Sequence, residues 1–147
     1  MYYKLGRMQD IKYTLEDLRA NPGLRLPPLK LVIERGMVER FCRAVGDDMN
    51  NWQTEAPPSL ALTLGFGQML EAISADNITV LHGSSELESL KPLEIGQEVV
   101  VETSLLSLRE RPGKMGLSSF LNFEMQVSNN KGELLARVCQ LAIIYSA

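Results

Sequence analysis

Residues 60–74 read LALTLGFGQMLEAIS and are apolar on nearly every side of the helix that they predict. A helix that is hydrophobic all round is buried, so the rest of the chain has to enclose it. Gly65 and Gly67 each lower the helix propensity of this stretch by about 1 kcal/mol relative to alanine. Glycines placed there favour close backbone contact, and we therefore expect a sheet wrapped around this helix.

After this stretch the pattern of apolar residues changes to a period of two, which is typical of β-strands. Residues 99–105 and residues 117–127 each place alternate apolar side chains on one face, and residues 134–146 are apolar on both faces. The stretches RPGK (111–114) and NNKG (129–132) predict the turns between these strands. A buried helix followed by long antiparallel strands predicts an α+β hot-dog fold, in which a curved antiparallel sheet wraps around one long buried helix.

The part of the chain before the helix is less regular. Residues 1–28 predict only a short helix, in TLEDLRA before NPG, and we expect them to form an N-terminal arm that packs on the domain or on a partner. We expect residues 29–147 to form a single hot-dog domain, because a chain of this length buries one core. Within it, residues 29–34 predict a strand, residues 36–45 an amphipathic helix, and residues 46–59 a polar loop long enough to carry function.

Charge and cysteine content narrow the classes of partner. The net charge is −3, and the lysines and arginines are scattered, which argues against nucleic acid as a partner. The two cysteines, Cys42 and Cys139, lack the spacing of a zinc site or a disulfide framework, so we expect no metal, no cofactor and a cytoplasmic location. No apolar stretch is long enough to span a membrane, and we expect no membrane association.

Three stretches together resemble a known family: FCRAVGDD (41–48), APPSLALTLGFG (56–67) and LHGSSELESLKPLEIGQEVVVET (81–103). They are similar to the N-terminal, often non-catalytic, hot-dog domain of the MaoC-like dehydratases and hydratases. The resemblance implies acyl thioesters of coenzyme A or acyl carrier protein as substrates, and the addition or removal of water next to the carbonyl. It also implies an aspartate and a histidine in a loop of the form GD.NP.H.

In this chain the loop reads GDDMNNW, so Asp47 matches the family aspartate and Trp52 lies where the histidine is expected. An indole N–H only donates hydrogen bonds, so Trp52 cannot accept a proton. The candidate catalytic residues are therefore Asp47 and His82, the single histidine of the chain. For each, a structural role is the competing interpretation: Asp47 bonds its own loop, or His82 makes a structural hydrogen bond at the start of a strand.

The candidate substrate-binding residues are Trp52, Ser59, Leu60 and Gly83. Trp52 forms either a flat wall against an acyl or pantetheine chain or a packing contact of the loop. Near Ser59 and Leu60 the free N–H groups of the helix start can receive a thioester carbonyl, or they are capped by Ser59 and water. Gly83 belongs to the His-Gly pair of the resemblance. Glu86 and Glu88 follow on one strand face and are expected to be solvated.

Three functions fit these observations. The leading hypothesis is a substrate-holding subunit of a 3-hydroxyacyl-thioester dehydratase or enoyl-thioester hydratase, with a degenerate Asp/His dyad. Such a chain is expected to bind acyl-CoA or acyl carrier protein thioesters and to form a homodimer, or a heterodimer with a catalytic MaoC-like subunit. Its degenerate loop resembles that of the non-catalytic subunits of mycobacterial mycolic-acid dehydratases. The alternatives are a stand-alone hydratase or acyl-CoA thioesterase, and a non-catalytic acyl-CoA-binding module.

Overall fold

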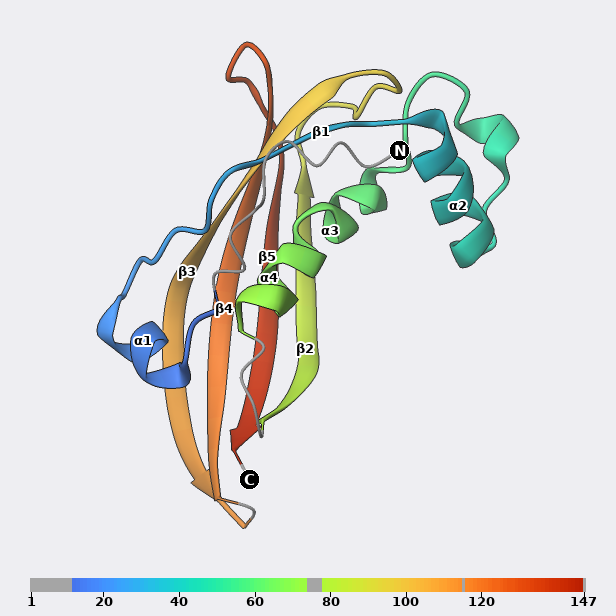
Figure 1. The fold of residues 1–147 in the computed structure, drawn as a ribbon. Helices are drawn as coiled ribbons and strands as arrows, with labels where there is room; N and C mark the ends of the chain where they lie inside the picture. Colours follow the sequence, from blue (N-terminus) through green and yellow to red (C-terminus); the bar gives the residue numbers. More distant parts are fainter. Residues whose placement is uncertain (1–11, 74–77, 115, 147) are drawn as a thin grey trace.

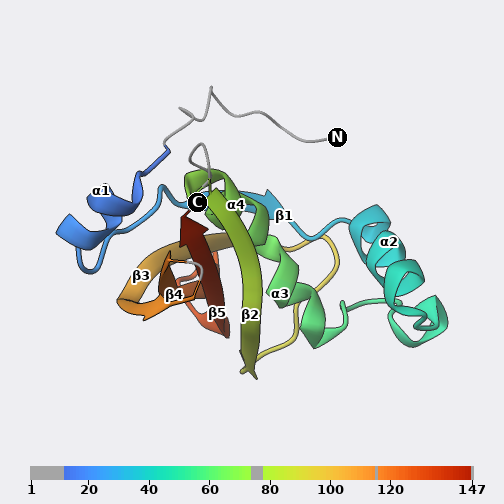
Figure 2. The ribbon, with the colours of Figure 1, turned by 90° about the horizontal axis from the view of Figure 1, so that it is seen from below.

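A computed structural model describes residues 12–73, 78–114 and 116–146. In the described chain one antiparallel sheet has the strand order β1-β3-β4-β5-β2. Its strands are β1 (Leu29–Val32), β2 (Ile78–Ser89), β3 (Glu98–Gly113), β4 (Gly116–Asn129) and β5 (Leu134–Ser146). The long strands curve around the central helical segment in Figures 1 and 2, and this arrangement is the predicted hot-dog fold.

The helical elements of the described chain lie mainly before the long strands. They are α1 (Leu15–Ala20), α2 (Arg35–Val45), η1 (Met49–Asn51), η2 (Pro58–Leu60), α3 (Ala61–Leu64) and α4 (Phe66–Ala72), where η denotes a 3₁₀ turn. The sequence patterns for α1, β1 and α2 are confirmed, and a capping box at Thr14 begins α1 while left-handed Gly46 ends α2. None of the helices in the described ranges has the length and apolarity required to cross a membrane.

The central helix differs in detail from the continuous one that the sequence predicts. A 3₁₀ turn begins it, and it divides at Gly65, which has φ −103° and ψ −3°. A Cβ at Gly65 would lie 3.2 Å from atoms of both Met125 and Val101, so the predicted close approach to the sheet is correct there. For Gly67 the same prediction is wrong, since a Cβ there would meet nothing within 4 Å.

The core lies between this helix and the concave face of the sheet. Side chains at alternate positions of β3, β4 and β5 are buried there, as the period of two predicts. They pack against Leu64, Met69 and Ile73 of the helical segment and form one cluster with it. The buried apolar residues of these strands are Val99, Val101, Leu105, Leu121, Phe123, Met125, Val127, Leu135, Ala136, Val138, Ala142 and Ile144.

The two edges of the sheet differ in what pairs with them. Residues 24–26 run beside β3 beyond β1, where the Leu26 N–H donates to the Thr103 carbonyl at 2.8 Å and the Leu105 N–H donates to the Leu24 carbonyl at 2.8 Å. Leu18 of α1 is buried against the same side, so the described part of the predicted N-terminal arm packs on the domain, while residues 1–11 lie outside the described residues. Strand β2 forms the opposite edge, and its outer side pairs with no strand in the described chain.

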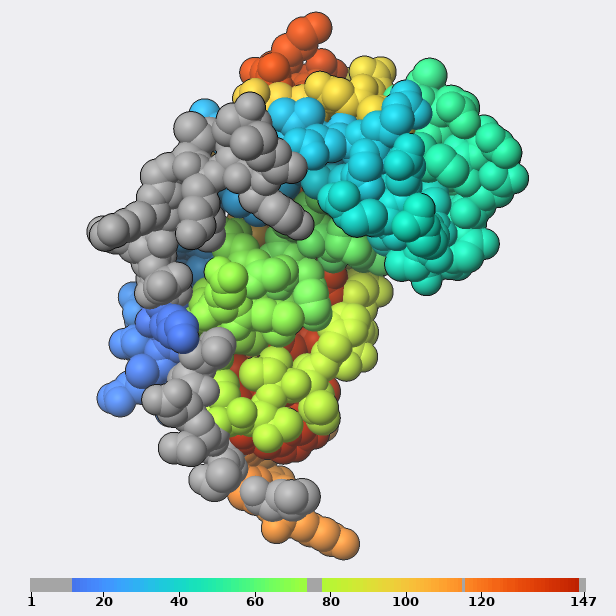
Figure 3. All heavy atoms as spheres, turned by 45° about the vertical axis from the view of Figure 1, so that its right-hand side comes forward, coloured from blue at the N-terminus to red at the C-terminus, as the bar shows by residue number. Residues whose placement is uncertain are grey.

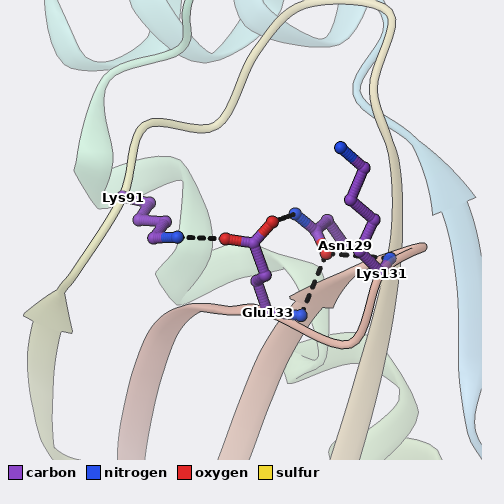
Figure 4. Close-up of polar contacts among 4 residues, drawn as sticks. All are labelled: Lys91, Asn129, Lys131 and Glu133. Atoms are coloured by element: carbon purple, nitrogen blue, oxygen red, sulfur yellow. Dashed lines mark hydrogen bonds and ion pairs between the residues drawn. The ribbon is translucent and has the colours of Figure 1, made fainter.

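A polar cluster fixes the hairpin between β4 and β5 (Figure 4). The Asn129 side-chain oxygen accepts hydrogen bonds from the backbone N–H groups of Lys131 and Glu133, each at 3.0 Å. The Glu133 carboxylate accepts from the Lys91 ammonium and, at 3.3 Å, from the Asn129 amide. The hydrogen bonds from Lys91 and then from Asn129 lower the pKa of Glu133, so the cluster holds this carboxylate in its charged form.

Candidate functional site

The loop that follows α2 begins with a left-handed turn at Gly46. The Asp47 N–H donates to the Cys42 carbonyl at 2.8 Å, which places Asp47 directly after the helix end. The Asp48 carboxylate then accepts from the Asn50 N–H at 2.9 Å and caps the 3₁₀ turn η1. These backbone contacts bring the side chain at position 52 back toward Asp47.

Both oxygens of the Asp47 carboxylate have a hydrogen-bond partner within the loop. The Asp48 N–H donates to Oδ1 at 2.8 Å, and the Trp52 indole N–H donates to Oδ2 at 2.8 Å. Trp52 is half-buried and packs against the core cluster. The residue at the histidine position of the motif thus binds the aspartate as a donor, which favours the loop-holding interpretation of Asp47.

The start of the central helix offers few free N–H groups. The Leu60 N–H donates to the Pro57 carbonyl at 3.0 Å, and the Ala61 N–H bonds to the carbonyls of Pro58 and Ser59. Proline at position 58 has no N–H, and Leu60 is buried. The 3₁₀ hydrogen bonds occupy the N–H groups of Leu60 and Ala61, whereas the Ser59 N–H has no backbone partner among the described residues and can donate to a ligand carbonyl.

A second polar group lies on the sheet and centres on His82 of β2. The His82 Nε2 lies 2.9 Å from the Gln140 Oε1 and 2.8 Å from the Ser85 Oγ. The Ser85 hydroxyl also donates to the Gln140 Oε1. Gln140 is 1% exposed, and its Nε2 donates to the Leu62 carbonyl of the helix at 3.0 Å. These three side chains form a hydrogen-bonded unit between β2, β5 and α3.

A β-bulge brings His82 and Ser85 to the same face of the sheet. The pairing of β2 with β5 shifts register between His82 and Ser84, so that His82 faces Ala142 while Ser85 faces Gln140. In a regular strand, residues three apart point to opposite faces, and the extra residue of a bulge reverses this. A Cβ at Gly83 would lie 2.9 Å from Leu141, which gives glycine at this bulge a structural reason.

The aromatic ring of Phe66 in α4 completes the surroundings of His82. The two rings meet edge to face, with their centroids 5.5 Å apart and their planes at 84°. This contact and the bond to Gln140 hold the imidazole on the helix side of the sheet, although His82 itself remains exposed.

The structure does not join the two candidate catalytic residues by any hydrogen bond between described residues. Asp47 bonds within residues 47–52, whereas His82 bonds to β2 and β5. In Figure 3, α2 and the loop after it lie at one end of the surface, and β2 lies lower beside α4. The two candidate residues therefore belong to separate hydrogen-bonded groups, one in the loop and one at the sheet edge.

Sequence reasoning missed Ser85 and Gln140. Gln140 has a signal in the sequence, because it is a polar residue on the apolar face that Val138 and Ala142 share. Ser85 has none, since a strict period of two puts it opposite His82 and only the bulge corrects this.

The thiols and acidic groups add no nucleophile or metal centre to the described chain. Burial, followed by the charges of Asp47 and Asp48, raises the pKa of Cys42, and burial, followed by Glu124 and Glu86, raises that of Cys139. Both thiols therefore stay protonated at neutral pH. In the ranges that the structure describes, no cluster of three His, Cys, Asp or Glu side chains has a metal-binding arrangement.

Comparison with solved structures shows the same fold in several proteins. The monoamine oxidase regulatory protein from Archaeoglobus fulgius is similar with a TM-score of 0.73 and 15% identity, over 92% of this chain and 96% of that one. The HadBC (3R-hydroxyacyl-ACP dehydratase) complex from Mycobacterium tuberculosis gives 0.66 and 16%, over 83% and 96%. R-hydratase PhaJ1 from Pseudomonas aeruginosa gives 0.65 and 13%, over 86% of each chain.

At these identities the solved structures establish the fold alone, and no curated protein matches the sequence. The family model of the FAS1-like, dehydratase domain region matches residues 20–138, which is most of the chain. The match confirms the expected kinship with the dehydratases. The chain therefore belongs to the family of the FAS1-like dehydratase domain region.

Proposed function

We propose that this chain is a substrate-holding subunit of a dehydratase or hydratase that acts on acyl thioesters of coenzyme A or acyl carrier protein. The observation that carries the proposal is the bond from the Trp52 indole N–H to the Asp47 carboxylate. A dehydratase needs one group that takes a proton and one that returns it or positions the water. Here the loop pairs its carboxylate with a group that can only donate, so the loop holds its shape and moves no proton.

The open edge of β2 supports a partner for this subunit. Strand β2 spans Ile78–Ser89 and exposes Leu81 at 49%. A long edge strand carries a row of unpaired N–H and C=O groups that another chain can cover. We infer that a second hot-dog subunit pairs along this edge, either a copy of this chain or a catalytic subunit with an intact GD.NP.H loop. HadBC, one of the similar structures, is itself described as a complex.

A stand-alone hydratase is the second candidate, and a specific observation favours it. His82 is exposed and anchored beside the central helix, so it can reach a ligand at the sheet edge without help from the loop. Under this alternative His82 replaces the missing histidine as the acid–base group. Asp47 then contributes nothing to turnover, because its carboxylate is bonded elsewhere.

The test combines binding with turnover on one sample. Trp52 is the single tryptophan of the chain, so its fluorescence reports directly on the loop. We expect crotonyl-CoA to change this fluorescence in a saturable way while the purified chain hydrates it at most weakly. Addition of a hot-dog subunit with an intact loop should then raise the hydration rate. If the chain binds neither crotonyl-CoA nor a crotonyl carrier protein, the proposal is wrong.

A further inference from the structure

Gln140 is a polar residue in an apolar layer, and its contacts fix how its amide is turned. Its side chain is 1% exposed, and its Nε2 donates to the Leu62 carbonyl at 3.0 Å. Since the Leu62 carbonyl can only accept, the amide nitrogen has to point toward the helix. The Gln140 Oε1 consequently points toward His82 and Ser85, where it can act only as an acceptor.

Two arrangements of protons are conceivable around that oxygen. In the first, His82 carries its proton on Nε2, and both this N–H and the Ser85 hydroxyl donate to the Gln140 Oε1. In the second, the Ser85 hydroxyl donates to an unprotonated Nε2. The second arrangement sets the lone pairs of Nε2 and Oε1 against each other at 2.9 Å and leaves a buried acceptor without a donor. The first arrangement gives a partner to the Nε2–H, to the Ser85 hydroxyl and to the buried Gln140 Oε1, so it is the stable one for the neutral ring.

The first proton arrangement makes His82 a hydrogen-bond acceptor for a ligand and excludes Ser85 as a nucleophile. A serine nucleophile activated by histidine requires the hydroxyl to donate to the ring nitrogen, which is the second arrangement. Ser85 is therefore not a nucleophile. In the first arrangement Nδ1 of the neutral ring is an acceptor, and it makes no hydrogen bond within the described residues. The ring lies exposed on edge strand β2, held by Phe66.

We propose that Gln140 is a positioning residue that holds His82 as its Nε2–H tautomer, so that Nδ1 accepts a hydrogen bond from a hydroxyl group on a ligand bound beside His82 on the helix side of the sheet. Because the His82 Nε2–H and the Ser85 hydroxyl both donate to the Gln140 Oε1, the neutral cluster offers a ligand only hydrogen-bond acceptors. It therefore favours a ligand that carries a hydrogen-bond donor. The ligand step rests on the proposed function, because it takes the ligand to be an acyl thioester. The positioning step rests only on the contacts of Gln140.

The first test is the tautomer of the neutral His82 ring, read from imidazole nitrogen-15 NMR in alkaline buffer. The chain contains one histidine, so both ring nitrogen signals come from His82, and their couplings to the ring protons Hδ2 and Hε1 distinguish Nδ1 from Nε2. We expect a protonated, pyrrole-type Nε2 and an unprotonated, pyridine-type Nδ1. The opposite pattern would overturn the inference whatever the chain binds.

Two variants separate positioning from a merely structural role. Gln140→Leu removes the acceptor, so Ser85 is left to donate to Nε2, and the proton should move to Nδ1. Ser85→Ala, a milder change at an exposed residue, should leave the Nε2–H tautomer in place because Gln140 still accepts. A tautomer that changes in Ser85→Ala would show that serine, not Gln140, sets the proton. Glu86→Gln is the matched control and should leave the tautomer of His82 unchanged. Glu86 is paired with Cys139, on the face of the sheet opposite to Ser85 and Gln140.

The second test compares 3-hydroxybutyryl-CoA with butyryl-CoA, which differ in one hydroxyl group. Calorimetry measures whether each binds, and NMR measures which ring nitrogen responds. We expect both to bind and only the hydroxylated thioester to shift Nδ1. Binding of both with no shift of Nδ1 would overturn the acceptor role and leave the proposed function standing. Binding of neither would overturn the proposed function and the ligand step together, while the tautomer would still decide the role of Gln140.

Discussion

Substitution of the two helix glycines measures how closely the central helix approaches the sheet. Alanine at either position gains about 1 kcal/mol of helix propensity over glycine. At Gly65 the new Cβ lies 3.2 Å from Met125 Cγ, Met125 Sδ and Val101 Cγ1, which is inside ordinary contact distance. Overpacking of this kind costs about 1–3 kcal/mol, so Gly65→Ala should range from neutral to about 2 kcal/mol destabilising. Gly67→Ala meets nothing and should stabilise by about 1 kcal/mol.

The helix-propensity gain cancels when the two variants are compared, and their difference isolates the packing term. Urea denaturation should place Gly67→Ala above Gly65→Ala by about 1–3 kcal/mol in the free energy of unfolding. In a thermal scan each kcal/mol corresponds to about 2–4 °C for a chain of this size. Gly65→Leu adds three more carbons at the same place and should disrupt folding or assembly. Equal stabilisation by alanine at both positions would refute the close approach at Gly65.

Three further predictions concern other parts of the chain. The pKa of Glu133 is lowered in the folded state, so this carboxylate contributes its full stabilisation above the ordinary glutamate pKa of about 4.3. The contribution is lost as the pH falls through the lower folded value. Lys91→Met should therefore flatten the acid limb of a plot of unfolding free energy against pH. Trp52→Phe keeps an aromatic ring but removes the hydrogen-bond donor to Asp47, and it should lower the free energy of unfolding by about 0.5–1.5 kcal/mol in urea denaturation. An unchanged midpoint would show that the bond between Trp52 and Asp47 does not stabilise the loop. Sedimentation should show a dimer or larger assembly, and Leu81→Lys should weaken this assembly. A monomer at working concentrations would count against pairing along β2.

Local patterns in the sequence are sufficient for most of the fold. The period of two predicts the buried faces of β3 and β4, and the cap residues predict the ends of α1 and α2, because these depend on neighbours along the chain. The glycines of the central helix predict the close approach at Gly65, but they predict neither the division of the helix there nor the open space beside Gly67. In addition, β3 continues through Gly113, into the stretch RPGK (111–114) that predicts the turn.

The candidate site was harder to predict, and the reasons are physical. The replacement of histidine by Trp52 is visible in the sequence, but its bond to Asp47 depends on the 3₁₀ turn between them. The cluster of His82, Ser85 and Gln140 depends on a bulge, which reverses the facing of every later residue of the strand. Both features combine a local signal with a change of geometry that only the folded chain supplies.

Hydration of an enoyl thioester by the purified chain alone shows whether this chain can catalyse the reaction without a partner subunit. General acid–base groups each contribute about 10²–10⁴-fold to such reactions, so a loop whose aspartate is bonded to tryptophan should leave at most weak activity. We expect a rate near background that neither Asp47→Asn nor His82→Gln lowers further, and that rises when a subunit with an intact loop is added. Robust hydration by the single chain, abolished by His82→Gln with the fold intact, would contradict the account and make His82 the acid–base group.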